Sequence, residues 1–258
     1  MRPDVVVDIG NTFIKWGRCL DGGIAAKASL DPNDDNAWER QCRHWQLPET
    51  ANWAVSGVHP ERVQRLVDWL KRRGQRVRVL DSLELPLQVD LDHPEWVGID
   101  RLLNGVAANH RRHPDNPAVV IDAGSAVTVD WIDANGAFAG GIIFPGIRLM
   151  ADTLHRATAL LPPVQIDATP IEVPAKSTPD AMRVGVVHAV AGGTIMATKR
   201  LLAAAKKKGI QTAEQCHIFV TGGDASLLAP YLSEDLAGTC VWPEMTLEGA
   251  RLSCEACT

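Results

Sequence analysis

A short acidic segment near the start of the sequence combines residue types that suit phosphate and metal chemistry. In Asp8-Ile9-Gly10-Asn11-Thr12 the glycine permits a tight turn whose backbone N–H groups can converge on an anion. Asn11 and Thr12 add side-chain donors, and Asp8 could carry Mg²⁺ through a water molecule. An ordinary hairpin turn uses the same residue types, so this segment alone leaves both interpretations open.

A second segment, which begins at Asp122, repeats the pattern in the later part of the chain. Asp122, Gly124, Ser125, Thr128 and Asp130 supply a carboxylate at a predicted strand end, a glycine turn and hydroxyl donors. Such a set suits a phosphate and cation site. Because acidic and hydroxyl groups occur at both strand ends, we interpret the two segments together as functional.

Asp100 and Arg101 stand at the start of a predicted helix, in the segment Gly98-Ile99-Asp100-Arg101. Exposed N–H groups and the helix dipole favour an acid there, so helix capping would explain Asp100. Asp100 could also accept the proton of a substrate hydroxyl during phosphoryl transfer, with Arg101 stabilising charge on the moving group. The two roles are compatible.

The common phosphate motifs GxxxxGK[ST] and GxGxxG are missing from the sequence.

Alternating strands and helices must position these residues. The hydrophobic spacing predicts strands at 5–8, 12–18, 53–58, 77–80, 118–122, 126–132, 138–146 and 217–221, and helices at 37–45, 60–73, 98–110, 147–161 and 180–207, with Gly209 as the last helix's cap. The polar connection 111–117 predicts a division into domains 1–115 and 116–258. Because the strand-turn-strand unit occurs in both, we expect two similar halves with both acidic turns in a shared cleft.

Composition narrows the class of protein. A net charge of −5 and a pI near 5.9 disfavour binding to nucleic acid or anionic lipid. The longest weakly polar stretch, 184–197, is shorter than the ~18 residues of a membrane span, and an early acidic residue disfavours a signal peptide. We therefore expect a cytoplasmic protein with no membrane span.

Six cysteines are too few for a disulfide scaffold, and Cys254 and Cys257 lack further ligands for a zinc site.

The motifs DIGNT, GIDR, DAGSAVTVD, GGIIFPG and TGG occur here in the order seen in type III pantothenate kinases, and the sequence resembles that family from about Val5 to Leu252. These enzymes belong to the superfamily of acetate and sugar kinases, actin and the heat-shock chaperone ATPase domain. The resemblance implies an α/β fold of two similar ribonuclease H-like (actin-like) halves. Each half is a mixed sheet flanked by helices, and the active site lies in the cleft between them.

The activity that the resemblance implies is phosphorylation of pantothenate by ATP, the first step toward coenzyme A, in a homodimer that needs Mg²⁺ and K⁺ or NH₄⁺. It also implies site residues. The ATP phosphates would be surrounded by Asp8, Ile9, Gly10, Asn11, Thr12, Phe13, Ile14 and Lys15, with Ser125 also contacting ATP. Pantothenate would meet Gly98, Ile99, Asp100 as the base, Arg101 and Thr178, while Asp122 would hold the monovalent cation.

Three positions differ from the family pattern. Leu91 stands where tyrosine is usual, which removes a polar group from the substrate side. Ser125 replaces threonine and Ser177 replaces asparagine, and both changes are mild.

Two alternatives follow for the function. Leucine at position 91 favours a kinase or phosphatase of the same superfamily that acts on another small metabolite. A nucleotide-binding accessory or regulatory protein is a third possibility, although the intact Asp8, Asp100 and Asp122 argue against it.

Overall fold

The structure is a computed structural model that describes residues 1–207 and 215–256. The chain divides into two compact units. The first unit consists of Met1–Arg111, the short segment Gly136–Phe138 and the C-terminal segment that begins at Glu244. The second unit consists of Arg112–Asn135 and Ala139–Pro243. The end of the chain therefore completes the first unit.

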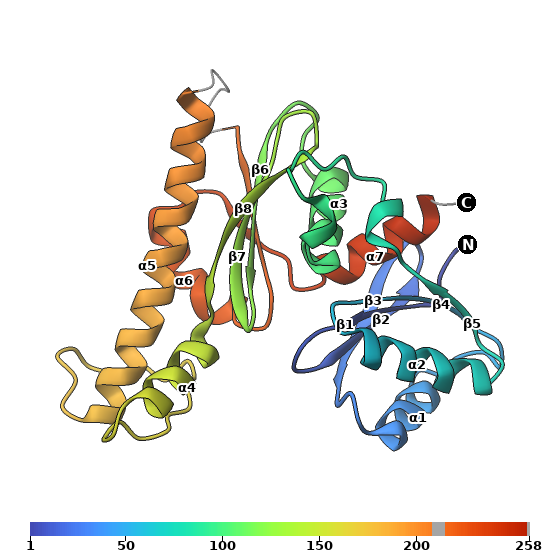
Figure 1. Ribbon diagram of the computed structural model, residues 1–258, viewed down its shortest axis with the longest axis horizontal. Coiled ribbons are helices and arrows are strands. Elements are labelled where there is room, and N and C mark those ends of the chain that lie inside the picture. The colour runs from blue at the N-terminus through green and yellow to red at the C-terminus, as the bar shows by residue number, and fades with distance from the viewer. Residues whose placement is uncertain (208–214, 257–258) are drawn as a thin grey trace. The chain divides into compact units, whose positions relative to one another are not determined.

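The first unit contains a mixed sheet of five strands in the order β3-β2-β1-β4-β5 (Figure 1). Its strands are β1 (Val5–Ile9), β2 (Ile14–Leu20), β3 (Gly23–Leu30), β4 (Asn52–Gly57) and β5 (Arg76–Val79). The strand β1 pairs antiparallel with β2 and parallel with β4. The predicted hairpin at the start of the chain is thus confirmed. The edge strand β3 was not predicted, because its small and mixed residues lack a strong apolar pattern.

Helices cover both faces of this sheet (Figure 1). The helices α1 (Asp35–His44) and α2 (Pro60–Arg72) lie on one face, and α3 (Ile99–Arg111) and α7 (Met245–Ala256) on the other. Two short 3₁₀ helices, η1 (Ser82–Glu84) and η2 (Pro94–Trp96), lie on the connection to α3. The helix α7 was not predicted from the sequence.

A cluster of tryptophans fills the space between the sheet and the helices α1 and α2. The cluster is built from Trp16, Trp38, Trp45, Trp53 and Trp69, all at most 5% exposed. The rings of Trp16 and Trp53 meet edge to face with centroids 4.9 Å apart, and those of Trp38 and Trp69 meet likewise at 5.4 Å. Five of the eight tryptophans therefore serve the core of one unit.

On the other face, α7 packs closely against α3. A Cβ atom at Gly249 would collide with the Leu103 carbonyl, so only glycine permits this approach. A buried hydrogen bond joins the same helices, because Thr246 Oγ1 donates to Asn104 Oδ1 at 2.8 Å. The C-terminal helix thus fixes the helix that carries Asp100 in its first turn.

The second unit repeats the topology of the first. Its strands are β6 (Ala118–Ala123), β7 (Ala126–Ile132), β8 (Phe138–Pro145), whose first residue belongs to the first unit, β9 (His217–Thr221) and β10 (Thr239–Val241). Their order, β8-β7-β6-β9-β10, matches β3-β2-β1-β4-β5 strand for strand. The hairpin β6–β7 corresponds to β1–β2, and β9 pairs parallel with β6 as β4 does with β1. The repeat predicted from the two acidic segments is therefore confirmed at the level of the sheets.

Three helices belong to the second unit, namely α4 (Ile147–Ala157), α5 (Thr178–Lys207) and α6 (Ala225–Asp235). Their apolar residues form one core with the sheet. The helix α4 ends four residues before the predicted limit, α6 was not predicted, and the predicted cap at Gly209 lies outside the described residues.

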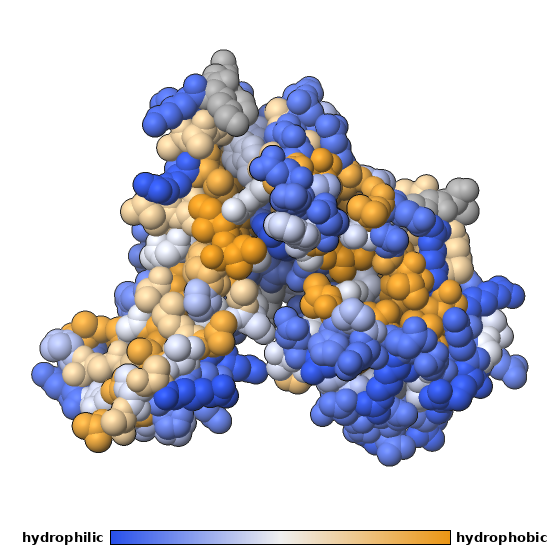
Figure 2. Space-filling view, viewed as in Figure 1, coloured by the Kyte–Doolittle hydropathy of each residue, from blue (hydrophilic) through white to orange (hydrophobic). Residues whose placement is uncertain are grey.

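The helix α5 is the part of the described chain that bears on the expectation of no membrane span. Within the described part of the chain it is long and apolar enough to cross a bilayer, because the helix continues well beyond the stretch 184–197 on both sides. Length and composition alone are weak evidence, since core helices of soluble proteins meet the same criteria. Val186, Val190 and Ala191 are buried in the second unit's core, while Figure 2 shows apolar surface over the same helix.

We predict that Gly249→Ala lowers the free energy of unfolding by about 1–3 kcal/mol, because the added methyl group must push α7 away from the Leu103 carbonyl. Urea unfolding followed by circular dichroism measures this change. Gly185→Ala on α5 is the matched control, since nothing lies within 4 Å of its Cβ position. It should be neutral or stabilise by up to about 1 kcal/mol. Equal losses in both variants would contradict the packing argument.

Candidate active site

The Asp8 turn lies at the carboxyl end of β1, between the two strands of the first hairpin. Asp8 is 6% exposed, whereas Asn11, Thr12 and Phe13 are exposed. The Gly10 N–H donates to the Phe13 carbonyl at 3.1 Å and closes the turn. A Cβ at Gly10 would approach that carbonyl to 3.4 Å, so the turn is tight without a left-handed backbone.

A contact that the sequence did not reveal fixes the backbone of this turn. Arg62, in the first turn of α2, donates from Nη1 to the Gly10 carbonyl at 3.0 Å and to the Asn11 carbonyl at 2.6 Å. Arg62 is one charged residue among several in an amphipathic helix and belongs to no recognisable motif, so its contact with the turn could not be predicted from the sequence.

The carboxyl end of β4 connects the Asp8 turn to the Asp100 segment. A Cβ at Gly57 would lie 2.6 Å from the Ile9 Cβ, so the two strands approach closely here only because residue 57 is glycine. The Val58 N–H donates to the Ile9 carbonyl at 3.2 Å. The same Val58 lies 3.6 Å from the Cβ position of Gly98. The structure therefore brings two segments together that are about ninety residues apart in sequence.

The Asp100 carboxylate folds back over the residue at which the segment begins. Its Oδ1 accepts the Arg101 N–H at 2.9 Å and lies 2.5 Å from the Cβ position of Gly98. Any side chain at Gly98 would displace the carboxylate. Asp100 also lies in the first turn of α3, where the helix dipole favours its negative charge. The Asp100 carboxylate thus accepts an N–H of the helix's first turn and is also half-exposed, so the structure is compatible with both of its expected roles.

Phe138 links Arg101 to the segment that contains Leu91. The Arg101 guanidinium lies over the buried Phe138 ring, 5.3 Å from its centroid. The Phe138 backbone accepts from the Asp90 N–H at 2.9 Å and donates to the Gln88 carbonyl at 2.8 Å. Leu91 follows directly. Phe138 precedes the GGIIFPG motif, and only the fold reveals its contact with Arg101.

In the second unit, glycines make room around Asp122. Asp122 is half-buried near the end of β6. Gly222, the first glycine of the TGG motif, has a φ of 96°, and a Cβ there would lie 2.5 Å from Asp122 Oδ1. Gly146 donates its N–H to the Ser125 carbonyl at 3.0 Å, and a Cβ at Gly146 would collide with the Gly124 carbonyl. Three motifs of the sequence therefore meet around this turn.

Asp224 is a further acidic residue at this end of the second sheet. Its N–H donates to the Ala123 carbonyl at 2.9 Å. Burial raises the pKa of its carboxyl group, and the positive charge of Arg148 opposes that rise. A perturbed carboxyl group beside a glycine-rich strand end is typical of functional sites. The sequence analysis did not select Asp224, although it directly follows the TGG motif.

Thr178 belongs to the second unit, while Leu91, Gly98, Asp100 and Arg101 belong to the first. Thr178 is the exposed first residue of α5. The preceding Ser177 caps this helix, since its Oγ accepts the Asp180 N–H at 3.2 Å and donates to Asp180 Oδ2 at 2.7 Å. Serine therefore serves as the helix cap at this position.

The donor sets fit hard cations bound together with phosphate. No group of three or more histidine, cysteine, aspartate or glutamate residues gathers within 1–207 and 215–256. Mg²⁺ is commonly held by one or two carboxylates plus substrate phosphates and water, so a single Asp8 suits it. The half-buried Asp122 could likewise offer one carboxylate ligand to an oxygen-bound ion.

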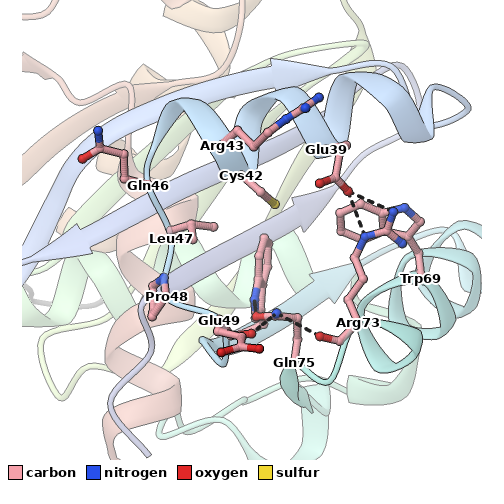
Figure 3. Close-up of a pocket in the computed structure, with 11 residues that line it drawn as sticks. Glu39, Cys42, Arg43, Gln46, Leu47, Pro48, Glu49, Trp69, Arg73 and Gln75 are labelled. Atoms are coloured by element: carbon pink, nitrogen blue, oxygen red, sulfur yellow. Dashed lines mark hydrogen bonds and ion pairs between the residues drawn. The ribbon is translucent and has the colours of Figure 1, made fainter.

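A pocket of about 450 Å³ lies elsewhere in the first unit, at the carboxyl ends of α1 and α2 (Figure 3). Three of its polar side chains, Glu39, Arg73 and Gln75, already have partners within the pocket. Arg73 binds Glu39 at 2.9 Å and stacks on Trp69, and Gln75 accepts from Trp53 Nε1 at 3.1 Å. Trp53 and Gln75 also stand at the amino ends of β4 and β5, whereas ligands of such sheets bind at the carboxyl ends. The pocket is therefore not the candidate active site.

Comparison with known proteins identifies relatives that match nearly the full length of the chain. The sequence profile of the type III pantothenate kinases matches residues 5–200. A type III pantothenate kinase of Alkalilimnicola ehrlichii is 33% identical over 250 residues and covers 95% of both chains. Another, of Acidiphilium cryptum, is 38% identical in an alignment of 272 positions that covers 96% of this chain and 92% of the relative.

Solved structures share the fold at low identity. A protein of Sinorhizobium meliloti assigned as a 2-dehydro-3-deoxygalactonokinase has a TM-score of 0.55 at 15% identity, over 98% of this chain and 97% of its own. This likeness supports the expected fold of two related units with helix-flanked mixed sheets. The profile match over residues 5–200 and the relatives at 33% and 38% identity show that this chain belongs to the type III pantothenate kinase family.

Proposed function

We propose that this chain transfers the γ-phosphoryl group of ATP to pantothenate and yields 4′-phosphopantothenate, the first step of coenzyme A biosynthesis. Family membership supports the reaction. The assignment of residues is supported by one observation. At the carboxyl ends of β1 and β4, Gly57 and Val58 bring the Asp8 turn close to the segment that contains Asp100. ADP release that requires ATP, Mg²⁺ and pantothenate together tests this function.

In the proposed site, the segment from Asp8 to Lys15 binds the ATP phosphates. Its backbone N–H groups and the side chains of Asn11 and Thr12 offer donors to phosphate oxygens. Ser125, in the corresponding turn of the second unit, contacts ATP as well. Mg²⁺ would be held by Asp8 and would supply charge neutralisation on the phosphates.

The acceptor side of the proposed site consists of Gly98, Ile99, Asp100 and Arg101, with Leu91 nearby. Asp100 takes the proton of the substrate hydroxyl as the phosphoryl group arrives, because Oδ1 of its half-exposed carboxylate accepts the Arg101 N–H and leaves Oδ2 to accept from the hydroxyl. Arg101, held over the Phe138 ring, offsets charge on the transferred group. Thr178 would contact pantothenate from the second unit.

Asp122 would hold K⁺ or NH₄⁺ in the second unit. We also propose a cytoplasmic homodimer that binds neither nucleic acid nor membrane. The net charge of −5 supports the former exclusion. Met196 on α5 and Ile143 on β8 are large exposed apolar side chains of the second unit that a second copy would cover.

A kinase for another small hydroxylated metabolite is the second candidate function. Leu91 favours it, since the family's usual tyrosine hydroxyl is lost from the acceptor side. Turnover assays with a panel of hydroxyl acceptors, compared by kcat/KM, distinguish the two candidates.

We predict that Asp100→Asn lowers kcat by about 10²-fold or more, because it removes the proton acceptor without changing the size of the side chain. The Kd for ATP should change less than about twofold. Steady-state kinetics and calorimetry measure the two quantities. Asp68→Asn, at an exposed position on α2, is the control and should retain full turnover. Near-normal turnover in Asp100→Asn would reduce Asp100 to a helix cap.

We predict different ion responses for Asp8→Ala and Asp122→Ala. Loss of Asp8 should raise the Mg²⁺ concentration that gives half-maximal activity, because the metal loses its protein carboxylate. Loss of Asp122 should instead weaken activation by K⁺ or NH₄⁺. Titrating each ion at saturating levels of the other separates the two effects. Identical response curves for both variants would refute the division of labour.

We predict that Leu91→Tyr lowers the KM for pantothenate several-fold, because the restored hydroxyl offers a hydrogen bond worth ~1 kcal/mol. The KM for ATP should barely change. Leu83→Tyr adds the same group at a position that is 73% exposed on η1 and should leave both constants unaltered. A Leu91→Tyr enzyme that binds pantothenate more weakly would instead indicate a pocket shaped around leucine and would favour another acceptor.

A further inference from the structure

Arg62 is the residue of α2 whose side chain reaches the candidate phosphate turn. One nitrogen, Nη1, donates both hydrogen bonds, to the carbonyl oxygens of Gly10 at 3.0 Å and Asn11 at 2.6 Å. Its position near the amino end of the helix, directly after β4 and Val58, places the guanidinium against the back of the turn. Two consecutive peptide groups of the turn are thus held by one side chain.

The planarity of the peptide bond gives this contact a consequence. In a trans peptide the C=O and the following N–H point in opposite directions. Since the carbonyls of Gly10 and Asn11 are directed at Arg62, the N–H groups of Asn11 and Thr12 are directed away from it. The hydrogen bonds therefore orient two neighbouring N–H donors to the same side of the turn, which is the arrangement that receives an anion.

Electrostatics favours the same orientation. A carbonyl oxygen that faced the phosphates would repel them, and the guanidinium holds two such oxygens on its own side. The pairing of β1 with β2 ends at Ile9 and Ile14, so the paired strands do not by themselves set the peptide planes of the turn between them. Arg62 consequently supplies the constraint that the strands do not.

We propose that Arg62 is a positioning residue that fixes the peptide planes of the Asp8 turn and thereby sets the affinity for the polyphosphate part of the nucleotide. The inference rests on the proposed role of this turn in binding ATP. Arg62 acts through the backbone, so its loss should affect ligands that carry phosphates and spare those that lack them.

Arg65 provides a matched control on the same helix. It also holds a loop, donating to the Pro32 carbonyl at 3.2 Å, to Asn33 Oδ1 at 2.7 Å and to Asp35 Oδ1 at 2.7 Å. The chemistry and the supporting helix are the same, but the loop is a different one. General destabilisation by loss of an arginine from α2 would appear in both variants.

The test measures equilibrium binding of a non-hydrolysable ATP analogue with Mg²⁺, of ADP and of adenosine to the full-length protein by calorimetry. We expect Arg62→Gln to weaken the analogue and ADP about tenfold while the affinity for adenosine stays within about twofold. Arg65→Gln should change none of the three affinities. Thermal unfolding of both variants checks that they are folded.

Arg62→Lys separates position from charge. Lysine keeps the positive charge, but its Nζ ends short of the place that Nη1 occupies, so we expect most of the affinity loss to persist. Full recovery of affinity in Arg62→Lys would overturn the proposal in favour of simple charge attraction. Equal losses for adenosine and ADP would overturn it as well. A wild-type protein that binds adenosine but not the ATP analogue would refute the proposed function itself.

Discussion

The close approach of backbone at the carboxyl end of β1 and β4 is the constraint on which the candidate site depends. Gly57 lies against Ile9 where a Cβ would overlap it, and Gly98 leaves the space that the Asp100 carboxylate occupies. Val58 contacts both regions. Because protein interiors are close-packed, a methyl group at either glycine would move an acidic side chain by a distance that matters for phosphoryl transfer.

The two units share one strand topology but differ around their acidic turns. In each, an antiparallel hairpin is extended by a parallel strand, so an acidic turn lies beside the end of a neighbouring strand. The surroundings differ. An arginine holds the Asp8 turn from α2, whereas glycines at 146 and 222 crowd the Asp122 turn with backbone. The same strand pattern therefore surrounds its acidic turn with different groups in the two units.

The helices behind the acceptor segment are fixed by contacts from distant parts of the chain. Gly249 and Thr246 of α7 hold α3, and Phe138 contacts both the Arg101 side chain and the segment that precedes Leu91. None of these residues has a recognisable motif, because their importance arises from what they touch. Side chains that position others are chemically ordinary, and this is why sequence reasoning passed over them.

Apolar periodicity and glycine turns are local properties, so the amino-acid sequence sufficed to predict the strands of both hairpins, five of the helices, the repeat and the acidic residues of the turns. It did not reveal β3, whose small residues lack a clear apolar pattern, or α7, whose buried residues are recognised as core only once the helix is seen to pack against α3. Tertiary structure alone decided that Arg62 holds the Gly10 and Asn11 carbonyls. Contacts between residues some fifty positions apart depend on how strands and helices pack, which no local pattern encodes.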